Sequence, residues 1–318
     1  MGSVIGLVLP FFGLIAIGYA TARVTKQPIE ALGWMNTFII YIALPALFFK
    51  LLSQTPVEQL VQWRFIVATT FSTFIIFVVA FALGAWSTKG SVGESTVIGF
   101  ASAYGNIGYM APGLALLAFG EAAVVPVALI FCFDNTLHFT LAPMLMAFRR
   151  NGNEQPSVSK LIGTAVWRII SHPFIIATIV GVLAAVFKLQ PPEAAQTLID
   201  YLANAAAPCA LFAMGVSLAL RPLKRVPVEA SFILPLKLVA QPLLVYWLVT
   251  SLGDFPPIWV YSAMLLAGLP SATNVFVIAQ QYGVWTERAS AMVLLTTVFS
   301  VITVTTLLYL TTNGLIPL

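Results

Sequence analysis

Polar side chains and helix-breaking residues gather in two otherwise apolar segments of the sequence. Tyr104–Gly113 reads YGNIGYMAPG and Gly268–Asn274 reads GLPSATN. Proline has no amide hydrogen and glycine loosens the backbone, so each segment should interrupt a helix. A half-helix that begins at such a break exposes N–H groups and about half a positive charge, which suits an anion. The candidate substrate-binding residues are Asn106, Gly108, Pro112, Pro270, Thr273 and Asn274.

Ordinary kinks are the alternative interpretation, because Gly and Pro are common in membrane helices. Two breaks with one asparagine each, Asn106 and Asn274, favour a binding site instead. In the second break, Pro270 stands where a half-helix would begin, and Asn274 follows one turn later on the same face.

One carboxylate lies deep inside an apolar segment. Asp134 falls in the middle of Ala122–Phe148, where insertion of an aspartate costs at least ~2.5 kcal/mol. His138 follows four residues later on the same helical face, and Asn135 adjoins. These three residues are candidates for ion or proton coupling. A structural polar clamp between helices would use the same residues.

Lys237 is a candidate cationic contact, since it follows Pro235 within an apolar segment. Its alternative is a side chain that snorkels to the membrane surface. We expect no metal and no cofactor. The two cysteines, Cys132 and Cys209, lie in apolar runs without a CxxC motif or a histidine partner.

The elements that must position these residues are membrane-spanning helices. Only 8% of the 318 residues are charged, against about 25% in a soluble domain. A span needs about 20 apolar residues. Ten candidates are present: Ser3–Ala22, Trp34–Leu52, Phe65–Trp86, Glu94–Phe119, Ala122–Phe148, Ile170–Phe187, Tyr201–Leu220, Phe232–Leu252, Ile258–Gln281 and Ala289–Thr311.

The basic residues predict the orientation. If the N-terminus is outside, eleven of the 15 Lys and Arg residues fall in inner loops. Positive charge collects on cytoplasmic loops, so we expect both termini outside the cytoplasmic membrane. The net charge of +4 is explained by these orientation signals, and no nucleic-acid partner is expected. The eleven are Arg23, Lys26, Lys89, Arg149, Arg150, Lys160, Arg168, Arg221, Lys224, Arg225 and Arg288; Arg64 and Lys188 fall outside.

The polar stretch from Arg149 to Lys160 divides the chain into halves of five helices each. We therefore predict a first repeat over 1–148, a cytoplasmic loop over 149–160 and a second repeat over 161–318. Because five is odd, the second repeat must be inverted across the membrane. Ala43–Phe48 (ALPALF) and Ala207–Phe212 (APCALF) are traces of this repeat, and the broken helices four and nine occupy matching positions.

The chain resembles the bacterial branch of the auxin efflux carrier family over almost its whole length. The resemblance rests on five segments in order: Ser171–Leu183, Asn204–Leu218, Leu236–Leu244, Gly268–Gly283 and Leu294–Val304. It implies a fold like that of bile-acid sodium symporters and sodium–proton antiporters. Helices 1, 2, 6 and 7 would form a scaffold, often a homodimer interface. Helices 3–5 and 8–10 would form a mobile core in which broken helices 4 and 9 cross.

The resemblance also implies an organic anion such as auxin, malonate or malate as the substrate, and maps the crossover site onto Asn106, Pro112, Pro270 and Asn274. We expect a secondary carrier, not an enzyme. The sequence has no HExxH motif, no pair of membrane aspartates and no GxxxxGK[ST] phosphate loop. A sodium–proton antiporter of related architecture is the alternative, although such antiporters usually place acidic residues at the crossing and only Asp134 is present. The lipid bilayer and the anion are the expected partners.

Overall fold

The computed structural model describes residues 2–55, 62–148, 163, 167, 170–171, 173–220 and 225–317, and its regular elements there are all helices. The predicted loop over 149–160 lies outside these residues. Six helices in the described ranges are long and apolar enough to cross a membrane, which is the pattern of a multi-pass membrane protein. They are Glu30–Ser53, Trp63–Ser87, Glu121–Ala147, Glu193–Ala219, Ala230–Leu252 and Thr286–Thr312.

The chain divides into two compact units, each assembled from separate stretches of sequence. Unit 1 comprises Met1–Trp63, Gly108–Cys132 and Ile170–Pro222. Unit 2 comprises Arg64–Ile107, Phe133–Ile169 and Leu223–Leu318. Each half of the sequence therefore contributes helices to both units.

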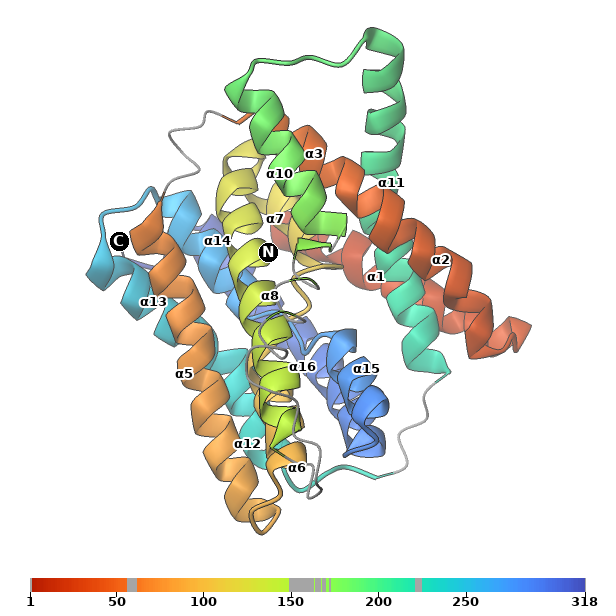
Figure 1. Ribbon diagram of the computed structural model, residues 1–318, viewed down its shortest axis with the longest axis vertical. Helices are drawn as coiled ribbons and strands as arrows, with labels where there is room; N and C mark the ends of the chain where they lie inside the picture. Colours follow the sequence, from red (N-terminus) through yellow and green to blue (C-terminus); the bar gives the residue numbers. More distant parts are fainter. Residues whose placement is uncertain are drawn as a thin grey trace. The chain divides into compact units, whose positions relative to one another are not determined.

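In unit 1 the first helix packs along α11 (Figure 1). Glycine makes this close approach possible: a Cβ at Gly18 would strike the carbonyl of Phe212, and a Cβ at Gly215 would strike that of Ile15. Small residues allow membrane helices to approach in this way. The elements of this unit are α1 (Gly2–Thr25), η1 (Ile29–Leu32), α2 (Gly33–Phe38), the π-helical η2 (Ile39–Ala43), α3 (Leu44–Ser53), α7 (Ala111–Phe119), η3 (Glu121–Ala123), the start of α8 (Val124–Ala147), α10 (Pro173–Val186) and α11 (Glu193–Ala219).

Helix α11 begins at Glu193, whereas the sequence predicted a start at Tyr201. Pro192 precedes the helix in an extended conformation, and Glu193 lies in the first turn. A proline before the first turn and an acidic residue within it both favour a helix start. Apolar character alone therefore located the membrane-crossing part of the helix and missed its polar first turns.

Unit 2 contains the second part of α8, helix α6 up to the first break, and both parts of the helix interrupted between α14 and α15. Its elements are α5 (Trp63–Ser87), α6 (Val92–Ala103), α12 (Ala230–Pro235), the π-helical η4 (Leu236–Ala240), α13 (Gln241–Leu252), α14 (Pro257–Ala267), α15 (Thr273–Tyr282) and α16 (Thr286–Thr312). Helices α12, η4 and α13 follow one another without a gap, so Lys237 lies in a wide π-helical turn. Such turns often occur at functional sites.

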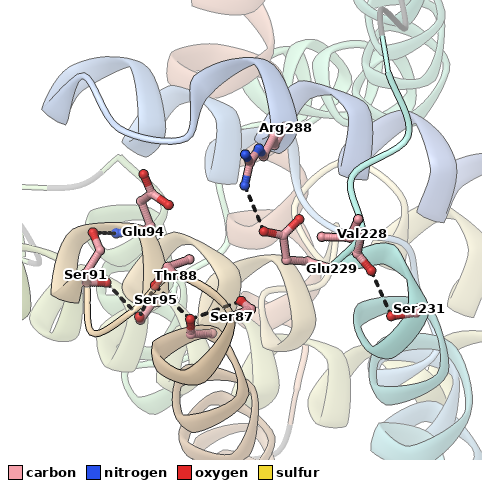
Figure 2. A network of polar contacts seen from close by, with 10 residues as sticks. Ser87, Thr88, Ser91, Glu94, Ser95, Val228, Glu229, Ser231 and Arg288 are labelled. Carbon is pink, nitrogen blue, oxygen red and sulfur yellow. Dashed lines mark hydrogen bonds and ion pairs between the residues drawn. The ribbon is translucent and has the colours of Figure 1, made fainter.

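A polar network holds the starts of α6, α12 and α16 in unit 2 (Figure 2). Glu229 is 1% exposed, and its carboxylate accepts a hydrogen bond from Arg288 at 2.8 Å. Ser91 caps α6 by accepting from the amide of Glu94. Figure 2 shows these caps and the ion pair within one group of polar side chains. The ion pair ties the starts of α12 and α16 to each other, and the hydrogen bonds around Ser91 fix the start of α6 to the end of α5.

Candidate functional site

The first break separates α6 from α7. Helix α6 ends at Ala103, and Tyr104 continues with an extended backbone (ψ 94°). Helix α7 resumes at Ala111 with Pro112 in its first turn, where a missing amide hydrogen is harmless. The predicted interruption is therefore present, and Gly105 and Gly108 lie inside it.

The second break separates α14 from α15. Helix α14 ends at Ala267 and α15 begins at Thr273, with Ala272 extended before it (ψ 145°). Pro270 lies within the break itself, three residues before the half-helix that it was predicted to begin. Proline pushes its preceding residue out of the helical conformation, and the chain needs two more residues to turn back into a helix.

The two breaks bond to each other through their backbones. Gly105 and Ser271 form an antiparallel bridge. The amide of Asn106 donates to the carbonyl of Pro270 at 2.8 Å, and that of Ala272 donates to the carbonyl of Tyr104 at 2.8 Å. Backbone groups freed inside a membrane protein cost several kcal/mol each if they stay unpaired. The bridge therefore lets both helices be interrupted at the same place.

Side-chain hydroxyls complete this pairing. Ser271 is fully buried, and its hydroxyl donates to the carbonyl of Ala101 in α6 at 2.5 Å. The hydroxyl of Thr296 in α16 accepts from the amide of Ser271 at 3.1 Å. The second break is thus fixed to α6 and to α16 within unit 2.

A phenol connects the side-chain amides of Asn135 and Asn274. The hydroxyl of Tyr104 donates to Oδ1 of Asn135 at 2.6 Å and accepts from Nδ2 of Asn274 at 2.9 Å. The ring of Tyr104 stacks on His138, with centroids 4.0 Å apart and planes 7° apart. Asn135 and His138 are buried, whereas Asn274 is half-buried. The arrangement can present amide and hydroxyl groups to a polar ligand at the start of α15.

A second chain of hydrogen bonds connects the buried carboxylate to a buried ammonium. The hydroxyl of Thr73 donates to Oδ2 of Asp134 at 2.9 Å, and Nε2 of Gln241 donates to that hydroxyl at 3.4 Å. Nζ of Lys237 donates to Oε1 of Gln241 at 2.6 Å. Lys237 is 0% exposed and Asp134 is 6% exposed. The snorkelling alternative for Lys237 is therefore wrong: the side chain points into unit 2.

Gln241 and Lys237 also bond to backbone carbonyls. Each donates a hydrogen bond to the last carbonyl of one helix before its break. Gln241 donates to the carbonyl of Ala103 at 3.1 Å, and Lys237 donates to that of Ala267 at 2.6 Å. A helix C-terminus leaves its last carbonyls unpaired and carries a partial negative charge. A neutral amide caps α6, and a full positive charge caps α14.

Unit 2 thus contains most of the sequence-predicted candidates. Asn106 and Pro270 belong to the paired breaks, Thr273 and Asn274 form the first turn of α15, and the coupling candidates and Lys237 lie on the helices around them. Gly108 and Pro112 belong to unit 1. Within the described ranges, no group of three or more His, Cys, Asp or Glu side chains is placed to hold a metal ion.

Five residues whose side chains take part in these networks were not predicted: Thr73, Tyr104, Gln241, Ser271 and Thr296. Gln241 carried a usable signal, because it follows Lys237 by four residues and so lies on the same helical face. A polar pair at this spacing in an apolar span indicates an interior contact. Tyr104 and Thr73 carried no such signal, since tyrosine and threonine are frequent in membrane helices.

Comparison with known proteins indicates a membrane transporter. A family model described as "Membrane transport protein" matches residues 3–308. A protein of Rhizobium meliloti named "Putative malonate transporter" is 59% identical over 317 residues, which cover 100% of this chain and 98% of the relative. A protein of Methanothermobacter thermautotrophicus named "Uncharacterized transporter" is 24% identical over 300 residues, which cover 93% and 94% of the two chains.

Proposed function

Because the chain belongs to the membrane transport protein family, we propose that it is a secondary carrier that moves a small carboxylate such as malonate across the membrane by alternating access. The match confirms the family that the sequence resembled. The relative that is 59% identical carries malonate in its name, which supports a dicarboxylate as the substrate. The observation that carries the proposal is the pair of interrupted helices, bonded to each other and surrounded by buried polar side chains.

The start of α15 supports an anion as the ligand. Thr273 and Asn274 form its first turn and are half-buried, so their polar groups can be reached. The first amides of a helix are unpaired and carry a partial positive charge. A carboxylate there would accept from these amides and from the Asn274 side chain, and Asn106 and Pro270 would shape the rest of its site within unit 2.

The architecture proposed around this site has ten spans in two inverted repeats of five. Helices 1, 2, 6 and 7 would form the scaffold, and helices 3–5 and 8–10 the mobile core. Both termini would lie outside the cytoplasmic membrane, and two copies would associate through the scaffold as a homodimer. The repeat traces support the two repeats, and the distribution of basic residues supports the orientation; the homodimer rests on the family resemblance alone.

The transport activity is tested with the purified protein in liposomes. Malonate loaded inside should drive uptake of labelled malonate by counterflow, because a carrier exchanges its substrate across the membrane. Malonate should also raise the melting temperature of the detergent-solubilised protein as its concentration increases. Acetate and citrate serve as size controls. Sodium-driven proton movement without any carboxylate response would instead identify an antiporter.

The proposed topology is tested by cysteine labelling in a background without Cys132 and Cys209. A cysteine placed at Gly152 should resist a membrane-impermeant thiol reagent in intact cells and react after the membrane is opened. A cysteine at Leu318 should react from outside. We expect this pattern because most basic residues fall in the loops assigned to the cytoplasm. The reverse pattern would exclude the orientation, and the same accessibility at both positions would exclude the inverted repeat.

A further inference from the structure

Helix α14 ends inside unit 2, and the negative end of its dipole there favours a positively charged partner. Its last carbonyl belongs to the buried Ala267, while the carbonyl of Leu266 accepts from the amide of Leu269 at 3.3 Å. Unpaired carbonyls and the helix dipole give such an end a partial negative charge. In carriers with interrupted helices, ends of this kind coordinate Na⁺ or H⁺. Lys237 supplies the positive charge here.

The surroundings of the ammonium are those of a bound monovalent cation. Nζ lies 2.6 Å from the carbonyl of Ala267 and 2.6 Å from Oε1 of Gln241, both neutral oxygens. A Cβ at Gly105 would lie 3.1 Å from Nζ and 3.1 Å from the carbonyl of Leu266. A side chain at this position would press on the ammonium, so glycine gives Nζ the most room beside the crossing.

The position of Lys237 is built into its helix. The residue lies in the π-helical turn Leu236–Ala240, and Pro235 and Pro242 stand on either side of this turn. Gln241 then connects the ammonium through Thr73 to Asp134. A basic and an acidic side chain are therefore joined in one hydrogen-bonded chain, in which Lys237 can balance the carboxylate of Asp134 without a second cation.

We propose that Lys237 is a tethered cation that replaces a coupling Na⁺ at the end of α14, so that substrate movement through the crossing requires no alkali cation. The inference rests on the proposed carrier function. It predicts that removal of the side chain back to Cβ leaves a site that a small free cation can fill.

The test compares wild type with Lys237→Ala in choline, sodium and ammonium chloride. Wild-type malonate counterflow should be the same in all three salts. Counterflow by Lys237→Ala in choline should fall about tenfold or more, the loss expected when hydrogen bonds from a charged group are removed. Ammonium should restore a large part of it. Lys237→Met fills the space without a charge and should be inactive in every salt.

A melting-temperature measurement without malonate separates this inference from the carrier function. Ammonium chloride should stabilise Lys237→Ala relative to choline chloride in a concentration-dependent way, and leave wild type and Lys237→Met unchanged. Lys50→Ala is the matched control, because Lys50 pairs with Asp200 in unit 1 at 2.8 Å and is partly exposed. It should show no ammonium response.

Each contrary result has a definite meaning. A wild-type requirement for Na⁺, or a folded Lys237→Ala protein that responds to no small cation in melting or counterflow, overturns the inference. If Lys237→Ala unfolds in choline, purification in ammonium chloride should recover it, and failure to recover it in either salt also overturns the inference. Absence of malonate counterflow in wild type, together with ammonium stabilisation of Lys237→Ala, would reject the substrate and keep the tethered cation.

Discussion

Replacement of Asn106 or Asn274 by alanine should abolish malonate binding at concentrations that saturate wild type, while folded protein remains in the membrane. Asn274 donates to Tyr104 at 2.9 Å and lies at the half-buried start of α15. Asn106 is 1% exposed and lies in the first break. Each substitution removes a side-chain amide group but little side-chain volume, so it should not leave a large cavity. Loss of a buried polar partner costs a few kcal/mol, or roughly 100-fold in affinity.

The binding experiment needs controls that separate contact from fold. Asn313→Ala changes an exposed asparagine after α16 and should leave malonate affinity as in wild type. Tyr104→Phe removes the hydroxyl between Asn135 and Asn274 and keeps the ring that stacks on His138. It should weaken binding less than Asn274→Ala. Near-normal affinity in both asparagine variants would place the site elsewhere.

The Asp134→Asn variant should lose accumulation driven by a pH gradient and keep exchange of labelled for unlabelled malonate. The substitution preserves shape and removes the proton that the carboxyl group could carry. Oδ1 of Asp134 and both ring nitrogens of His138 are buried without a hydrogen-bond partner among the described residues. If one proton accompanies each substrate, wild type should accumulate up to about tenfold per pH unit, and the variant should only equilibrate.

Exchange and accumulation are to be measured in the same liposomes. Asp254→Asn changes an exposed carboxylate between α13 and α14 and should behave as wild type. Thr73→Val removes the hydroxyl that donates to Asp134 and should alter accumulation more than exchange. Loss of both activities in Asp134→Asn would indicate a structural or substrate-contacting role. Unchanged accumulation would exclude Asp134 as the coupling group and favour transport driven by the membrane potential.

The sequence located the helix breaks because their cause is local. Pro112, Pro270 and the nearby glycines affect the backbone at their own positions, whatever surrounds them. The environment of Lys237 could not be found in this way, since it depends on how the helix is rotated about its axis. The same lysine would reach the membrane surface if that face pointed to lipid.

Contacts between residues that are far apart in the sequence could not be predicted from local patterns either. Tyr104 meets Asn135 and Asn274 from different helices, and nothing in the sequence pairs residues that are 31 and 170 positions apart. The polar start of α11 was missed for a simpler reason. A search for apolar runs ends where Glu193 and Asp200 begin to interrupt them, although the backbone continues as a helix.

The backbone bridge between the two breaks also has a mechanical consequence. Separation of Gly105 from Ser271 would strip two amides and two carbonyls of their partners in a place without bulk water, at several kcal/mol for each group. The bridge therefore couples the two helices mechanically: a force that moves α6 also moves α15. A conformational change that transports the ligand should carry both breaks together as one rigid piece. The backbone of the two breaks would then keep its shape during the alternating access that we propose.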